Sequence, residues 1–131
     1  MGVDAGFFAK KAKRYFWFDR LYNIEAYNHD DVWTKELDDI YYKLRNERSA
    51  RASEVLALLE ANIKAWMLEP LEPEDQGYHV GWCKAAMEFV KTFSDDEFFV
   101  SGDNHDAYDL IGSMYGEAGH WTGEYMEWVD G

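Results

Sequence analysis

The fold is decided by the stretch 53-SEVLALLEANIKAWML-68 and by the segment that follows it, 73-PEDQGYHVGWCKAAMEFVKTF-93. In both, apolar residues recur every three or four positions, which is the period of an amphipathic α-helix. The expected apolar stripes are Val55, Leu56, Leu59, Ile63, Trp66 and Met67 in the first, and Tyr78, Trp82, Ala85, Ala86, Phe89 and Phe93 in the second. Pro70 ends the first helix and Pro73 opens the second, so two helices joined by a short loop are predicted.

Two further helices are predicted on either side of this pair. The one before it has its apolar positions at Trp33, Leu37, Ile40, Tyr41 and Leu44, with Asp30 or Asp31 as N-cap. The one after it has them at Tyr108, Ile111, Met114 and Tyr115, and Gly116 closes it.

The N-terminal residues predict a β-hairpin. Val3, Ala5, Phe7 and Ala9 alternate with more polar neighbours, the run 15–18 (Tyr-Phe-Trp-Phe) has strong β-propensity, and residues 10–13 form the turn. The second strand is aromatic on both faces, which indicates a central strand covered on two sides. Residues 21–27 extend this strand or form a third one.

Two later segments have strand or mixed character. Residues 98–100 (Phe-Phe-Val) predict a short strand that joins the N-terminal sheet. In the tail, the spacing of Trp121, Tyr125 and Trp128 suits a helix, which Gly123 weakens.

These elements predict an α+β fold: a small antiparallel sheet, made of the hairpin and the later short strand, packed with about four helices. The chain has 131 residues and no Pro/Gly/Ser-rich linker, so residues 1–131 are expected to form a single acidic domain. An apolar fraction of 47% excludes a disordered acidic tail. We expect no membrane-spanning segment or secretory signal and therefore a cytoplasmic protein.

Charge is distributed unevenly along the chain, whose net charge is -13. Residues 1–20 carry five bases and two acids, and residues 21–91 carry eight bases and fourteen acids. Residues 92–131 carry ten acids and no Lys or Arg. Such a segment is either a solvated face that keeps the protein soluble or a surface shaped to meet a basic partner.

The densest polar cluster lies at 101-SGDNHDAYD-109. Carboxylates and an imidazole this close together suit a metal site, whose weak candidate ligands are Asp103, His105, Asp106 and Asp109. The alternative is structural: Asp103 as the N-cap of the following helix, with Asp106 completing a capping box.

The remaining reactive side chains predict no catalytic site. His29, His79 and His120 are scattered, and the lone Cys83 lies on an apolar helix face, as a small core residue would. A single cysteine also excludes a disulfide framework. No phosphate-binding Gly-rich loop, nucleophile elbow or His-Glu-x-x-His motif is present, so no cofactor is expected and an enzyme is the less favoured class.

The preferred hypothesis is a non-enzymatic acidic inhibitor that binds the basic nucleic-acid-binding groove of a partner by placing carboxylates where phosphates would lie. In size and charge the chain resembles phage anti-restriction and anti-CRISPR proteins. The predicted partner-binding residues are the ten acids of the C-terminal third: Asp95, Asp96, Glu97, Asp103, Asp106, Asp109, Glu117, Glu124, Glu127 and Asp130.

Two alternatives remain open. One is a small metal-dependent hydrolase or ligand-binding domain that uses the Asp103–Asp109 cluster. The other is an immunity-type protein that neutralises a basic toxin. Direct nucleic-acid binding by the basic strip at Lys10–Arg14 is disfavoured, because the overall charge repels a polyanion. Neither the partner nor the oligomeric state follows from the residues.

Overall fold

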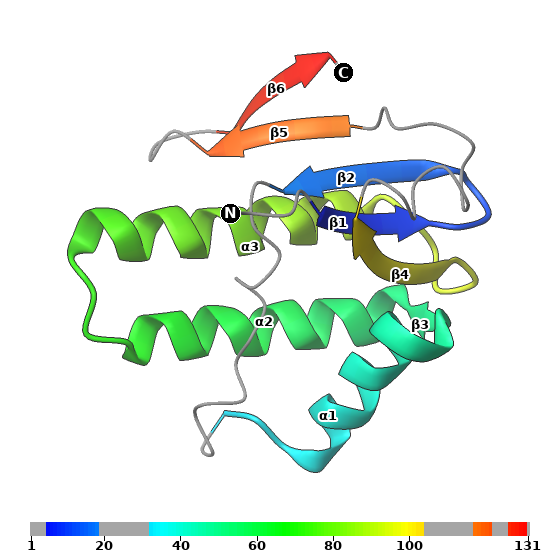
Figure 1. Cartoon of the computed structure of the whole chain (residues 1–131), viewed down its shortest axis with the longest axis horizontal. Helices are drawn as coiled ribbons and strands as arrows, with labels where there is room; N and C mark the ends of the chain where they lie inside the picture. Colours follow the sequence, from blue (N-terminus) through cyan, green and yellow to red (C-terminus); the bar gives the residue numbers. More distant parts are fainter. Residues whose placement is uncertain (1–4, 19–31, 104–116, 122–125, 131) are drawn as a thin grey trace.

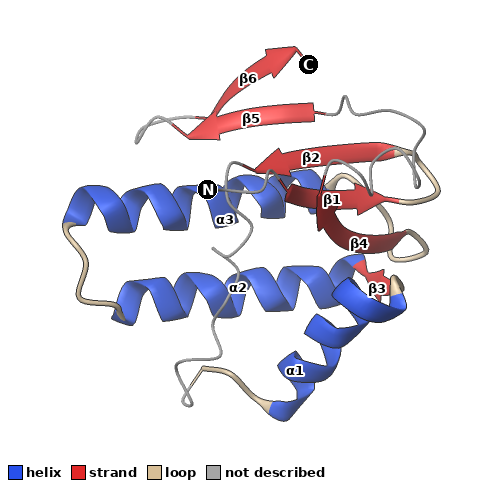
Figure 2. Cartoon of the chain, in the orientation of Figure 1, coloured by secondary structure: helices blue, strands red, loops and turns tan. Residues whose placement is uncertain are grey.

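A computed structural model describes residues 5–18, 32–103, 117–121 and 126–130 (Figure 1). Three α-helices and a six-stranded sheet make up this part of the chain (Figure 2). In chain order the elements are β1 (Ala5–Ala9), β2 (Arg14–Phe18), α1 (Lys35–Tyr42), the π-helical turn η2 (Lys43–Glu47), β3 (Ala50–Arg51), α2 (Ala52–Leu68), α3 (Pro73–Lys91), β4 (Phe98–Asp103), β5 (Glu117–Trp121) and β6 (Met126–Asp130).

The sheet has the strand order β3-β4-β1-β2-β5-β6. The predicted hairpin is confirmed: β1 pairs antiparallel with β2, the turn spans residues 10–13, and Lys13 takes a left-handed φ of 56° within it. The predicted later strand is confirmed too, because β4 pairs antiparallel with β1.

The expectation of a small antiparallel sheet is only partly right. Strand β5 joins parallel to β2, with Phe16 opposite Glu117 and Trp17 opposite Ala118. Parallel neighbours need a long crossover, and here the chain from α1 to β4 supplies it. In the tail, whose spacing suited a helix that Gly123 weakened, the described residues form two antiparallel strands, β5 and β6.

Helices α2 and α3 pack against one face of the sheet and against each other (Figure 1). The core between them is aromatic: the ring of Phe16 lies 6.3 Å from that of Trp82 and 5.3 Å from that of Phe89. Phe8 and Val100, register partners on β1 and β4, are also buried. Adjacent residues of one strand point to opposite faces, so the sheet centre is covered on both faces.

The buried face of α2 differs from the predicted stripe. Val55 and Leu59 are buried as expected, but Leu58, Ala61 and Ala65 are buried with them, whereas Met67 is 58% exposed. The buried face of α2 therefore includes small alanines and leaves out Met67. The helix itself agrees with its prediction, since it ends two residues before Pro70.

Helix α1 begins later than predicted. Its N-cap is Thr34, whose Oγ1 accepts a hydrogen bond from the Leu37 N–H at 3.2 Å, and this corrects the assignment to Asp30 or Asp31. The helix passes into the π-helical turn η2, which ends at Arg48 with a left-handed φ of 56°. Pro73 stands at the first position of α3, where its missing N–H costs no hydrogen bond.

Several predicted features lie outside the described residues. They are the strand extension at 21–27, the helix over 108–115 and the residues His29, His105, Asp106, Asp109 and Glu124.

Candidate functional site: the acidic residues and a carboxylate-lined groove

Glu97, one of the predicted partner-binding acids, is a structural residue. It is only 5% exposed, and its carboxylate accepts three backbone hydrogen bonds. Its Oε1 accepts from the N–H groups of Lys11 and Phe98, both at 2.8 Å, and its Oε2 accepts from Ala12 N–H at 2.9 Å. The carboxylate that the sequence assigned to a partner therefore holds the β1–β2 turn.

Asp95 is bound to the start of α2. Its Oδ1 accepts a hydrogen bond from Ser53 N–H at 2.9 Å, so it satisfies a free donor of the first helical turn. This backbone hydrogen bond lowers the pKa of the Asp95 carboxyl, and the nearby Arg51 guanidinium contributes to the same shift. The Arg51 guanidinium also donates to the Asp95 carbonyl at 3.1 Å.

Asp96 has an exposed side chain, 74% of which is accessible to solvent. It accepts a hydrogen bond from the Ser94 hydroxyl, and Lys11 Nζ lies 4.0 Å from its Oδ2. The Ser94 hydrogen bond, and then the Lys11 charge, lower the pKa of this carboxyl. All three acids of the loop at 94–97 therefore accept hydrogen bonds from within the chain.

For the other predicted acids within the described residues, the structure gives a position in a strand. Asp103 is the last residue of β4, where it pairs with Ala5, and the helix it would cap lies outside the described residues. In β5 and β6 the register places Glu117 opposite Asp130 and His120 opposite Glu127. Strand β6 is an edge strand of the sheet.

Two lysines of the hairpin turn and Arg51 of β3 lie near one aromatic ring. The Phe98 ring has Arg51 Cζ at 4.3 Å from its centroid, Lys11 Nζ at 5.4 Å and Lys10 Nζ at 6.0 Å. The Lys10 ammonium also donates to the carbonyl of Arg48 at 3.1 Å. Lys11 also forms an ion pair with Asp96, which is far from it in the sequence.

A groove of about 430 Å³ along α1 and η2 gathers acids that the sequence did not single out. It is lined by Glu36, Asp39, Ile40, Tyr42, Lys43, Glu47 and Glu54. Four carboxylates against one ammonium give this lining a net charge of -3. Tyr42 is 55% exposed, so a large aromatic side chain lies at its edge.

Lys43 is the cation in the lining of this groove. Its Nζ lies 2.8 Å from Glu54 Oε2, and this hydrogen bond is the main reason that the Lys43 pKa is raised. The charges of Glu54, Glu47 and Asp39 raise it further. Carboxylates around an ammonium favour its charged form, so the same lining can hold the ammonium or guanidinium group of another molecule.

The sequence carries part of the signal for this groove. Glu36 and Asp39 are three residues apart and therefore share a face of α1. Glu47 follows in the π-helical turn, and π-helical turns occur frequently at functional sites. Glu54 comes from α2, so only the packing of α1 on α2 brings it to the groove.

Metal-binding and nucleophilic chemistry receive no support from the described ranges. No three His, Cys, Asp or Glu side chains there are grouped so that they could hold a metal ion. Cys83 is 1% exposed, and burial raises the pKa of its thiol to about 12, as expected for a core residue. None of the described helices is both long and apolar enough to cross a bilayer.

Comparison with known proteins returns no relatives. No protein-family model, no curated protein and no solved structure matches this chain.

Proposed function

We propose that this protein is a non-enzymatic inhibitor that binds, through its carboxylates, a basic surface that another protein uses for nucleic acid. The observation that carries the proposal is the groove of α1 and η2, with its net charge of -3 in a chain whose net charge is -13. A protein surface built for DNA is lined with Lys and Arg, because duplex DNA carries one charge per roughly 1.7 Å. Carboxylates held in a groove satisfy such side chains as phosphates do.

The positions of the charges favour α1 and η2 over the loop at 94–97 as the binding surface. Asp95, Asp96 and Glu97 accept hydrogen bonds from the chain itself. In the groove, Glu54 likewise accepts hydrogen bonds from the chain, from the Arg51 N–H at 3.0 Å and from Lys43 Nζ at 2.8 Å, so the charge offered to a partner is that of Glu36, Asp39 and Glu47. Long-range attraction by the whole acidic surface raises the rate of encounter with a basic partner, and the groove supplies the contact.

The test begins with capture from a nuclease-treated lysate on the immobilised protein at low salt. Each captured protein is then purified, and its affinity is measured by calorimetry at low and high salt. We expect the partner to be basic, its affinity to fall steeply with salt, and duplex DNA to compete for the same site.

A matched pair of variants locates the contact. E36Q/D39N removes two charges from the groove, while E60Q/E88Q removes two from α2 and α3. We expect weaker binding only for the first variant. Equal losses in both would reduce the role of the groove to net charge, and affinity that does not change with salt would overturn the proposal. A captured basic partner that does not bind nucleic acid would instead favour the immunity-type alternative.

A further inference from the structure

Two apolar side chains at the end of α2 are exposed without contributing to the core. Met67 is 58% exposed and Leu68 is 60% exposed, and in the described part of the chain the only other exposed large hydrophobic is Tyr42. Adjacent exposed apolar side chains of this size are typical of contact surfaces.

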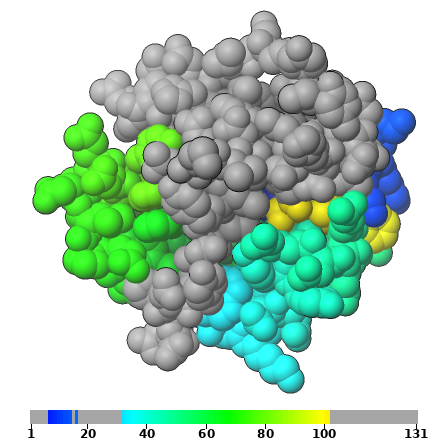
Figure 3. All heavy atoms as spheres, viewed as in Figure 1, coloured from blue at the N-terminus to red at the C-terminus, as the bar shows by residue number. Residues whose placement is uncertain are grey.

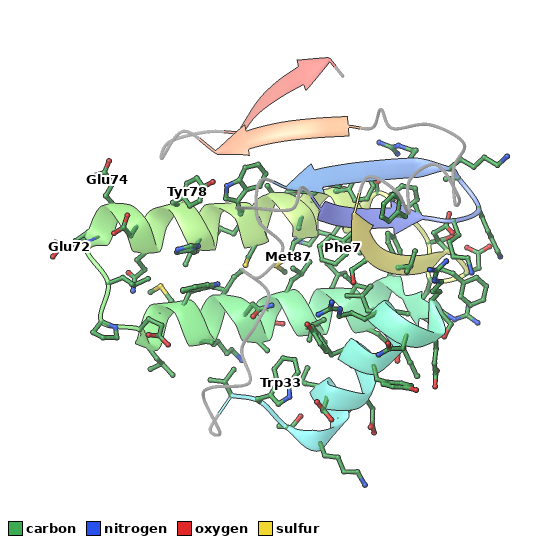
Figure 4. All side chains as sticks on the ribbon, in the orientation of Figure 1. Phe7, Trp33, Glu72, Glu74, Tyr78 and Met87 are labelled. Carbon is green, nitrogen blue, oxygen red and sulfur yellow. The ribbon has the colours of Figure 1, made fainter. Side chains whose placement is uncertain are left out.

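Acids follow this apolar pair along the chain, and Lys64 lies one helical turn before it on α2. Glu69, Glu72, Glu74 and Asp75 follow within seven residues, and positions 65–83 contain no Lys or Arg. Glu72 and Glu74 project away from the body of the molecule, at the end of the helical pair farthest from the β1–β2 turn (Figure 4).

The connection between the helices is held in one conformation. Gln76 Nε2 donates to the carbonyl oxygens of Trp66 at 3.3 Å and Met67 at 3.4 Å. The rings of Trp66 and His79 stack at 4.0 Å with an interplanar angle of 6°. Both prolines of the chain, Pro70 and Pro73, lie in this connection. A surface that is ordered before binding loses little conformational entropy when it docks.

We propose that this tip, which comprises Met67, Leu68, Glu69, Glu72, Glu74 and Asp75, docks on a basic protein surface that offers an apolar hollow to Met67 and Leu68. The inference rests on the proposed function and names a second, apolar contact. The negative charge of the tip determines which kind of partner can dock on it. A second copy of the tip carries the same four acids and is repelled, as is an anionic lipid surface. Only a surface with bases around an apolar centre matches both features.

The tip and the groove are separate parts of the surface. In Figure 3 the end of the helical pair lies at the left, in green, and α1 and η2 lie at the lower right, in cyan and teal. A partner that contacts both the tip and the groove must span the distance between them. A short peptide can contact one of them at a time, so it tests each surface separately.

The test uses a synthetic helical peptide with a pair of leucines flanked by arginines, titrated into ¹⁵N-labelled protein and followed by NMR. We expect chemical-shift changes at residues 66–76 and binding that weakens with salt. A peptide with serines in place of the leucines is expected to bind about tenfold more weakly, since the two apolar contacts together contribute roughly this factor.

Variants of the tip provide the matched comparison. M67S/L68S is expected to lose the same factor, while the swap M67L/L68M keeps the apolar surface and is expected to keep the affinity. Both sites are exposed, so neither variant removes core packing. Shift changes confined to residues 36–54 would overturn the tip and leave the proposed function standing, whereas no binding of either basic peptide would overturn both. Self-association of the protein, or binding to anionic vesicles that M67S/L68S abolishes, would also refute the chosen occupant.

Discussion

Replacing Glu97 by glutamine is expected to destabilise the protein strongly, although only one oxygen changes to nitrogen. The carboxylate accepts three backbone hydrogen bonds, two at 2.8 Å and one at 2.9 Å. A glutamine keeps one acceptor oxygen and turns an NH₂ donor toward an N–H donor, so at least one bond is lost. Hydrogen bonds to charged groups contribute about 1.5–3 kcal/mol each, so we expect a loss of about 2–4 kcal/mol.

The assay is equilibrium unfolding by denaturant and by heat, followed by circular dichroism. In a chain of this size the loss corresponds to a fall in the thermal midpoint of roughly 6–16 °C. The matched control is D96N, which removes the same charge one residue earlier, from a side chain that is 74% exposed. We expect D96N to move the midpoint far less. If E97Q unfolds within about 0.5 kcal/mol of the original protein, or if D96N loses as much, the account of the turn is wrong.

Four further measurements examine other parts of the structure. Gly77 is an exposed residue of α3, and an added Cβ meets nothing within 4 Å, so G77A should stabilise the protein by about 0.5–1 kcal/mol in denaturant unfolding; a loss would contradict the open site. Asn62 is fully buried, and neither its Oδ1 nor its Nδ2 has a hydrogen-bond partner in the described structure, so N62L should stabilise by about 1–2 kcal/mol. Destabilisation by N62L would reveal a polar partner. The Cys83 thiol, with its pKa raised to about 12, should resist alkylation at pH 8 until the protein unfolds, and rapid labelling of the folded protein would refute its burial. The Ser53 N–H lowers the Asp95 pKa, so the stability it contributes is complete above the unfolded pKa of about 3.9 and is lost as pH falls through the lower folded pKa. D95N should therefore flatten the acid limb of a plot of unfolding midpoint against pH, and an unchanged limb would remove Asp95 as its source.

The local elements followed from the sequence because each depends on a short-range pattern. The period of the apolar residues in 53–68 and 73–93 predicted α2 and α3, and the aromatic run at 15–18 predicted β2. The pairing of β4 with the hairpin was also predicted. The parallel joining of β5 to β2 was not, because no local pattern records which distant strand lies alongside.

The sequence predicted less of the candidate site than of the fold. Net charge and its bias toward the C-terminal third can be counted along the chain, and they indicated a basic partner. The same count assigned Glu97 to the interface, whereas the turn that uses its carboxylate lies 85 and 86 residues earlier in the chain. Likewise, Glu54 meets the acids of α1 only through helix packing.

The sequence by itself therefore determined the helices, the hairpin and the sign of the charge. Only the tertiary structure decided which carboxylates accept hydrogen bonds from distant parts of the chain and how far each is exposed to solvent. The physical reason is range: secondary structure depends on neighbours a few positions apart, whereas the hydrogen bonds of a carboxylate depend on whichever donors the folded chain brings within about 3 Å.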